Sequence, residues 1–349
     1  MARPAIAPPP CEVLGRLAGM RILVVGAGGS IGSALALRLA AQEPSALVLL
    51  DESETSLDAL QRRWNRERAV APAVFCLGSM ADTALLDEIF ALYAPQLVFH
   101  AAAFKNVPVL EGQPLAAIRN NIFGTLAVTR AAAGARILLL STDKAVAPAS
   151  LMGATKRVAE RIVCAAGGTA LRLGNVLASR GSVVEIFAGQ IAEGGPLTVT
   201  APAARRYFLT MDEAVNLLLA SALEPESPAL LAPKLPASHA IVDLARFMAR
   251  ELAPCRAIPI VVTGLRAGDK ETEKFWSGKE RSRPADSENL FCVESPPFDH
   301  RELHSGLARL RAALEARDCR ASLSLLQGLV PDYTPSAALL ALAGEDVPG

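Results

Sequence analysis

Residues 21–32 read RILVVGAGGSIG, and this stretch decides the fold. The apolar run 21–25 predicts a short buried strand, and the alanine- and leucine-rich residues after the glycines predict a helix. Strand, glycine-rich turn and helix in this order are typical of a dinucleotide-binding unit, because glycines let the backbone approach a pyrophosphate that rests on the helix N-terminus. The pattern therefore predicts a cofactor-binding turn made of Gly26, Gly29, Ser30, Ile31 and Gly32.

Asp51 follows a second predicted strand, residues 46–50, and lies about 25 residues after Gly26. An acid at roughly this spacing binds the ribose diol in dinucleotide-binding folds. Its negative charge would repel a 2′-phosphate, so we expect NAD as the cofactor. The neighbouring Arg62 and Arg63 keep NADP possible.

Strands and helices continue to alternate through the first half of the chain. Strands are predicted at 73–77, 97–100 and 137–140, and helices at 83–93 and 112–133. The small residues Ala101 and Ala102 follow one of these strands and would let the cofactor pass close to the backbone. This array predicts an α/β fold with a Rossmann-type doubly wound parallel sheet.

Residues 141–160 read STDKAVAPASLMGATKRVAE and follow the apolar run 137–140. Thr142, Asp143 and Lys144 therefore lie at the carboxyl end of a predicted strand, where open α/β sheets place their chemistry. On the helix that follows, Met152 and Lys156 lie four residues apart and share one face. A capped helix start with surface lysines gives the same pattern, so this stretch alone does not decide for a site.

The regular pattern loosens after residue 169. Strands are expected at 171–173 and 258–262, and helices near 183–193, 212–223, 241–251 and 301–317. Scattered arginines beside glycines and asparagines suggest a smaller, discontinuous C-terminal lobe that binds an anionic ligand, although ordinary surface arginines give the same pattern. We expect a flexible N-terminal tail at 1–19, the Rossmann domain at 20–175, and mainly the substrate-binding lobe, with segments returning to the Rossmann domain, at 176–349.

The composition excludes several classes of protein. Half of the 349 residues are apolar and a fifth are charged, which is enough to bury a substantial core. The formal net charge is zero, so we expect no nucleic-acid partner. No apolar run reaches the ~18 residues of a membrane span, and no signal-peptide pattern opens the chain, so we expect a cytoplasmic protein. Neither the six scattered cysteines nor the four histidines have metal-ligand spacing, and we expect no metal site.

Five segments resemble, in order, those of one enzyme family. They read GAGGSIGS, HAAAFKNVP, STDKAVAPASLMGATKRVAE, RLGNVLASRGSV and GLRAGDK. Together they are similar to the nucleotide-sugar branch of the extended short-chain dehydrogenase/reductase superfamily, and more closely to its polysaccharide-biosynthesis UDP-N-acetylglucosamine 4,6-dehydratases. The likeness runs from about Arg21 to about Asp332, nearly the whole chain.

The resemblance implies a role for individual residues. The glycines of the turn would bind the cofactor diphosphate, Asp51 the adenosine ribose and Lys156 the nicotinamide ribose. Asn121 matches a buried asparagine that supports the active-site water and backbone. Thr142, Asp143 and Lys144 match the catalytic trio. The positions that match substrate-binding residues are Lys105, Asn175, Arg206 and Arg266.

The chemistry that the resemblance implies is an internal oxidation and reduction. A 4,6-dehydratase moves hydride from sugar C4 to NAD, eliminates water across C5 and C6, and returns the hydride to C6. By resemblance, Lys144 is the base for the C5 proton, Asp143 the acid for the C6 hydroxyl, and Thr142 a hydrogen-bond partner of the C4 oxygen. These roles require a protonated Asp143 and a neutral Lys144 at the start, which burial would favour in both cases.

The chain departs from the family pattern at four positions. Met152 stands where most short-chain dehydrogenases have tyrosine, and a thioether cannot take the C4 hydroxyl proton. Some dehydratases of this group share the methionine. The other departures are Asn106 in place of histidine, Ser79 in place of aspartate and Asp269 in place of glutamate.

We expect a homo-oligomer that acts on a nucleotide sugar, UDP-N-acetylglucosamine being the first choice. Two alternatives use the same fold: a nucleotide-sugar 4-epimerase and a dehydratase that inverts C5. A third alternative is a non-catalytic protein that senses NAD or a nucleotide. The adjacent Asp143 and Lys144 speak against a plain epimerase, which needs no acid and base at C5 and C6.

Overall fold

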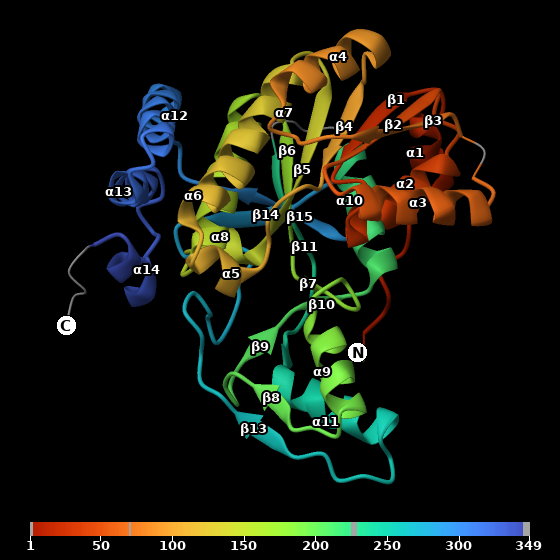
Figure 1. Cartoon of the computed structure of the whole chain (residues 1–349). Helices are drawn as coiled ribbons and strands as arrows, with labels where there is room; N and C mark the ends of the chain where they lie inside the picture. The colour runs from red at the N-terminus through yellow and green to blue at the C-terminus, as the bar shows by residue number, and fades with distance from the viewer. Residues whose placement is uncertain (1–2, 70, 225–228, 345–349) are drawn as a thin grey trace.

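A nine-stranded sheet forms the centre of the computed structural model, which describes residues 3–69, 71–224 and 229–344. The strand order is β14-β15-β11-β6-β5-β4-β1-β2-β3. The strands from β3 to β11 are parallel, and β15 and β14 extend that edge in antiparallel pairing (Figure 1). The chain thus has the predicted Rossmann-type doubly wound fold.

The central strands are buried, as expected from the predominance of apolar residues in their sequences. All residues of β4 and β6, for example, are buried. The strands of the sheet are β1 (Arg21–Val25), β2 (Ala46–Asp51), β3 (Ala73–Leu77), β4 (Leu97–His100), β5 (Arg136–Thr142), β6 (Thr169–Leu173), β11 (Ala229–Pro233), β14 (Arg281–Pro284) and β15 (Leu290–Glu294).

Helices cover both faces of the sheet. One face packs against α2 (Ser30–Ala40), α3 (Glu54–Arg66) and α10 (Met211–Leu223). The other face packs against α4 (Thr83–Tyr93), α7 (Thr125–Ala131) and α8 (Leu151–Ala165). Within the described parts of the chain, no helix is both long and apolar enough to cross a membrane.

A second layer of helices covers the outer side of α8. It consists of α5 (Val107–Glu111), α6 (Pro114–Ala117), α12 (His300–Glu315), α13 (Cys319–Leu329) and α14 (Ala337–Leu342). The sequence predicts one helix near 301–317 among polar loops, whereas the structure contains three in this region (Figure 1). Their buried leucines, such as Leu310 and Leu323, belong to the same apolar cluster as Ile162 of α8.

The helix predicted at 112–133 is interrupted. A π-helical turn, Ile118–Gly124, lies between α6 and α7. Such turns insert an extra residue into a helix and occur frequently at functional sites. Asn120 and Asn121 both lie in this turn and are buried.

Residues 3–19 differ from the expected flexible tail. The segment folds into α1 (Cys11–Leu14) and a short turn of 3-10 helix, Gly15–Leu17. The Arg3 guanidinium forms an ion pair of 2.6 Å with Glu213, and the Asn216 side chain donates to the backbone carbonyl of Ile6. These contacts attach the segment to α10, which the proline-rich sequence does not reveal.

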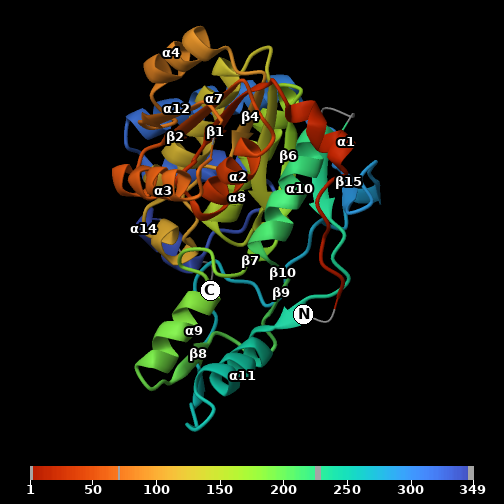
Figure 2. The ribbon, with the colours of Figure 1, turned by 90° about the vertical axis from the view of Figure 1, so that its right-hand side faces the viewer.

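A smaller lobe projects from the carboxyl edge of the sheet (Figure 2). Two separate segments of the chain, 183–206 and 239–262, build its own apolar core around Phe187, Leu197 and Met248. Its elements are α9 (Val183–Ala192), β8 (Leu197–Val199), β9 (Arg205–Arg206), β12 (His239–Ala240), α11 (Ile241–Leu252) and β13 (Ile260–Val262). The pair β7 (Asn175–Val176) and β10 (Phe208–Leu209) connects this lobe to the sheet.

Candidate active site

The glycine turn lies between β1 and α2, where the order of the strands reverses. Gly26 has a φ of +83°, and a Cβ atom on it would lie 2.6 Å from the backbone nitrogen of Ala102. The residue after β1 and the residues after β4 therefore touch, which requires glycine at this position. Ligands of open α/β sheets bind at such a reversal point.

Two cavities lie on either side of this turn. One, of about 240 Å³, is lined by Gly26, Asp51 and Ala102. The other, of about 500 Å³, extends from the turn to the small lobe. The residues that the sequence predicts and that line this larger cavity are Gly29, Ser30, Ile31, Gly32, Ala101, Lys105, Thr142, Lys144, Met152, Lys156 and Asn175.

Asp51 is held at the end of β2 by backbone donors. Its carboxylate accepts hydrogen bonds from the N–H groups of Gly28, at 2.8 Å, and Ser53, at 2.9 Å. The carboxylate thus braces the glycine turn while it faces the smaller cavity. This is the position expected of an acid that binds a ribose diol.

Asn121 fastens the segment after β4 to helix α8. Its side chain accepts from the Phe104 N–H at 2.8 Å and donates to the Phe104 carbonyl at 3.0 Å and to Thr155 Oγ1 at 3.1 Å. Asn120 donates to the same amide oxygen. Because these contacts use both the oxygen and the nitrogen of the amide, the Asn121 side chain holds the backbone of Phe104 in place.

Asp143 and Lys144 lie in a tight turn directly after β5. The Asp143 side chain is fully buried, and its Oδ1 accepts from Thr142 Oγ1 and from Lys144 Nζ, both at 3.0 Å. Helix α8 packs closely on this turn, since a Cβ atom on Gly153 would lie 2.2 Å from the Lys144 carbonyl oxygen. The N-cap Ser150, which accepts from the Gly153 N–H, starts the helix at this point.

Glu273 is a second acid at this turn, and the sequence analysis missed it. Its buried carboxylate lies 3.8 Å from Lys144 Nζ and 2.8 Å from Lys270 Nζ. Burial alone would lower the pKa of Lys144, but the carboxylates of Asp143 and Glu273 outweigh burial and raise it. Lys144 is therefore an ammonium at neutral pH in this arrangement, which corrects the expectation of a neutral amine.

Lys156 and Met152 share a face of α8, as predicted, and both are buried. Burial lowers the pKa of Lys156 to about 8, against a smaller opposing effect of Glu160. No described residue forms a hydrogen bond with the Lys156 ammonium, which faces the larger cavity. Such a group is suited to bind hydroxyls of a ligand.

Only two of the four predicted substrate-binding residues line the larger cavity. Lys105 and Asn175 line the larger cavity, and Asn175 Oδ1 accepts from Lys144 Nζ at 3.1 Å. Arg206 is buried, and its guanidinium donates to three backbone carbonyls, those of Arg205, Lys270 and Glu271. Arg266 is exposed and paired with Asp269 at 2.8 Å. In this structure both arginines hold the segment around 270 rather than line the cavity.

The remaining departures from the family pattern have local partners. Asn106 caps α5 by accepting from the Val109 N–H. Ser79 donates to Glu52 at 3.2 Å, beside the smaller cavity.

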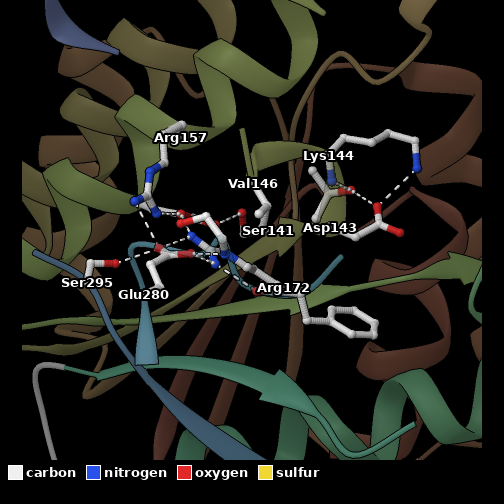
Figure 3. Close-up of polar contacts among 12 residues, drawn as sticks. Ser141, Asp143, Lys144, Val146, Arg157, Arg172, Glu280 and Ser295 are labelled. Atoms are coloured by element: carbon white, nitrogen blue, oxygen red, sulfur yellow. Dashed lines mark hydrogen bonds and ion pairs between the residues drawn. The ribbon is translucent and has the colours of Figure 1, made fainter. Parts of the chain in front are cut away.

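A buried ion network supports the site from behind (Figure 3). Arg172 is fully buried, and its five N–H groups donate to Glu160, Glu280 and the carbonyl of Phe275 at 2.7–3.0 Å. Arg157 pairs with the same two glutamates at 2.9 Å. The network joins α8 and β6 to the segment that carries Glu273.

Arg180 is the second residue that the sequence analysis missed, and it lines both cavities. It lies within RLGNVLASRGSV, so its motif was visible, but nothing in the sequence places it against the glycine turn. Glu273 follows the GLRAGDK segment by three residues and gave no signal of its own.

The sequence is similar to those of known proteins. The chain is 40% identical over 282 residues, 77% of its length, to the probable polysaccharide biosynthesis protein EpsC of Bacillus subtilis, of which it covers 47%. It is 30% identical over 81% of its length to a UDP-glucose 4-epimerase of Rickettsia akari, of which it covers 84%. The chain thus spans about half the length of EpsC and most of the epimerase.

Solved structures share the fold. Pen from Bacillus thuringiensis superposes with a TM-score of 0.73 at 26% identity, covering 80% of this chain and 89% of Pen. WbmG from Bordetella bronchiseptica, solved with NAD and UDP, gives a TM-score of 0.59 at 22% identity over 72% of this chain and 84% of WbmG. The profile of one family, described as polysaccharide biosynthesis protein, matches residues 22–295. The chain belongs to this polysaccharide biosynthesis protein family, and it is also related to the UDP-glucose 4-epimerase of Rickettsia akari.

Proposed function

We propose that the protein is an NAD-dependent nucleotide-sugar 4,6-dehydratase that acts on UDP-N-acetylglucosamine. The observation that carries the proposal is that Thr142 and Lys144, both in contact with the buried Asp143, line one cavity with Lys156 and the glycine turn. An acid and a base are needed together for elimination of water, whereas oxidation at C4 alone needs neither at C5 and C6.

The residues around the two cavities fit NAD. The glycine turn and the N-terminus of α2 provide N–H groups for the diphosphate, Asp51 suits the adenosine ribose, and Lys156 suits the nicotinamide ribose. WbmG, which has this fold, was solved with NAD. When bound, NAD supplies the hydride acceptor for sugar C4 and the hydride donor for C6.

The proton steps can be assigned so that atoms balance. The Asp143 carboxylate takes the C4 hydroxyl proton through Thr142 Oγ1, which lines the cavity, and the same proton later passes to the C6 hydroxyl, which leaves as water. Lys144 takes the C5 proton, and its ammonium, which exchanges protons with solvent, then protonates C5. In this scheme Asp143 becomes the required acid during C4 oxidation, so Met152 need not carry a proton.

Lys144 must lose its own proton before it can act as a base. Its pKa is raised by Asp143 and Glu273 despite burial, and its side chain is 22% exposed, so the proton can leave to solvent. The rate should therefore rise with pH until Lys144 is neutral.

A nucleotide-sugar 4-epimerase is the second candidate, because the Rickettsia akari relative bears that name. An epimerase would have no use for Lys144 at C5. A dehydratase that inverts C5 would use the same residues and differ in the face of reprotonation.

Incubation of the protein with UDP-N-acetylglucosamine and NAD in deuterated water, followed by proton NMR, tests the proposal. A C6 methyl signal with deuterium at C5 supports the dehydratase, and the C5 coupling distinguishes retention from inversion. Epimerisation without a methyl signal contradicts the dehydratase and favours the epimerase. Binding of both ligands without turnover contradicts the proposed reaction and favours a sensing role.

A further inference from the structure

Arg180 reaches from the small-lobe side of the larger cavity to the glycine turn. Its backbone N–H donates to Ser30 Oγ at 3.0 Å, and its guanidinium donates to Ser56 Oγ at 2.9 Å and to the Gly28 carbonyl at 2.5 Å. Three contacts thus hold one arginine against the turn and the first helix turn of α3.

The position of Arg180 coincides with the junction of the two cavities. Gly29 and Arg180 are among the residues that line both cavities. A dinucleotide with its adenosine beside Asp51 and its nicotinamide beside Lys156 must pass its diphosphate through this junction. Two N–H groups of the guanidinium are used by Ser56 and Gly28, and the others have no hydrogen-bond partner among the described residues.

A second cation lies next to Arg180. Lys105 Nζ donates to the Arg180 carbonyl at 2.8 Å. Burial and then the charge of Arg180 lower the pKa of Lys105, and nearby Glu185 opposes this only in part. Two adjacent cations that destabilise each other are suited to a ligand with negative charge between them.

We propose that Arg180, together with the adjacent Lys105, binds the diphosphate of the nicotinamide cofactor. The inference rests on the proposed use of NAD. It goes further in that it assigns a contact with the cofactor to a segment of the substrate side: residues 174–177 and 179–184 line the larger cavity.

The test measures binding rather than turnover. NAD, ADP-ribose and UDP are titrated by calorimetry into nucleotide-free wild-type protein and into Arg180→Ala and Arg180→Lys. ADP-ribose carries the diphosphate without the nicotinamide. The control is Arg250→Ala, since Arg250 is an exposed arginine of α11 paired with Glu251.

Loss of a charge-assisted contact predicts at least about tenfold weaker binding of both NAD and ADP-ribose by Arg180→Ala. Arg180→Lys should recover part of the loss, because it keeps the charge without the guanidinium geometry, and Arg250→Ala should bind like the wild type. Unchanged binding of both ligands by Arg180→Ala, or a loss confined to UDP, overturns the inference and leaves the proposed function intact. Wild-type protein that binds neither NAD nor ADP-ribose contradicts the proposed cofactor itself. Equal melting temperatures of the variants show that they fold.

Discussion

Lys144 Nζ lies 3.0 Å from Oδ1 of Asp143, its neighbour in the chain. Adjacent residues seldom direct their side chains at one another, and the tight turn after β5 makes this contact possible. Lys144 lines the same cavity as Lys156, and the buried Asp143 lies directly behind it.

Lys144→Met should abolish elimination. The methionine keeps most of the volume but cannot take the C5 proton, so the rate of methyl formation should fall by roughly 10²–10⁴-fold. NAD binding should persist, because Lys144 lies outside the glycine turn. The measurement is the NMR assay in deuterated water.

Lys274→Met is the matched control, since Lys274 is exposed and adjacent to Glu273. It should keep the wild-type rate. Normal methyl formation by Lys144→Met would remove Lys144 from the mechanism.

Glu273→Gln should shift the pH dependence of the reaction. Glu273 helps to raise the pKa of Lys144, so its removal should lower that pKa. Because the base must be neutral, the rising limb of kcat/KM against pH should move to lower pH. Rates measured across the pH range report this shift.

Glu271→Gln serves as the control for Glu273, because its side chain is exposed in the same segment. A rising limb that stays in place in Glu273→Gln would show that the limb reports a group other than Lys144.

Met152→Leu should leave catalysis intact. The swap conserves the volume of a buried side chain and should change the free energy of unfolding by less than about 1.5 kcal/mol. If Asp143 takes the C4 hydroxyl proton, the sulfur has no proton to move. A fall in kcat to the level of Lys144→Met would assign the thioether a direct role in the reaction.

The parts of the fold that depend on local pattern could be predicted from the sequence. The strand, the glycine turn and the helix of residues 21–40 are contiguous in the chain, and the face shared by Met152 and Lys156 follows from helix geometry. The parts that depend on distant contacts could not. Arg3 is fixed by Glu213 on α10, far along the chain, so a proline-rich composition gave the wrong expectation of a free tail.

In the site, too, the features that depend on distant contacts could not be predicted from the sequence. Arg206 is a residue type that commonly binds phosphate, but its guanidinium donates to the backbone carbonyls of Lys270 and Glu271 instead. Glu273 reaches Lys144 through a segment that the Arg172 network holds in place. Protonation of Lys144 depends on these long-range neighbours, so burial alone predicted the wrong state.

Glu280→Gln should destabilise the protein at neutral pH and change how acid unfolds it. Glu280 is buried, and hydrogen bonds and ion pairs with Arg172 and Arg157 outweigh desolvation and lower its pKa from 4.5 to about 2. A carboxylate whose pKa is lower in the folded state stabilises that state above its unfolded pKa, and the contribution is lost as pH falls through the folded value. The stability that Glu280 contributes should therefore be complete above about pH 4.5 and disappear towards pH 2.

At pH 7 the variant leaves Arg172 and Arg157 without one partner, so the free energy of unfolding should fall by about 3–5 kcal/mol. Urea unfolding of both proteins between pH 7 and pH 2.5 measures the difference, which should narrow as pH falls. Glu294→Gln is the control, because Glu294 pairs with Arg283 at the surface and should change stability little at any pH. An equally small effect of Glu280→Gln at pH 7 would show that the buried network does not stabilise the segment that carries Glu273.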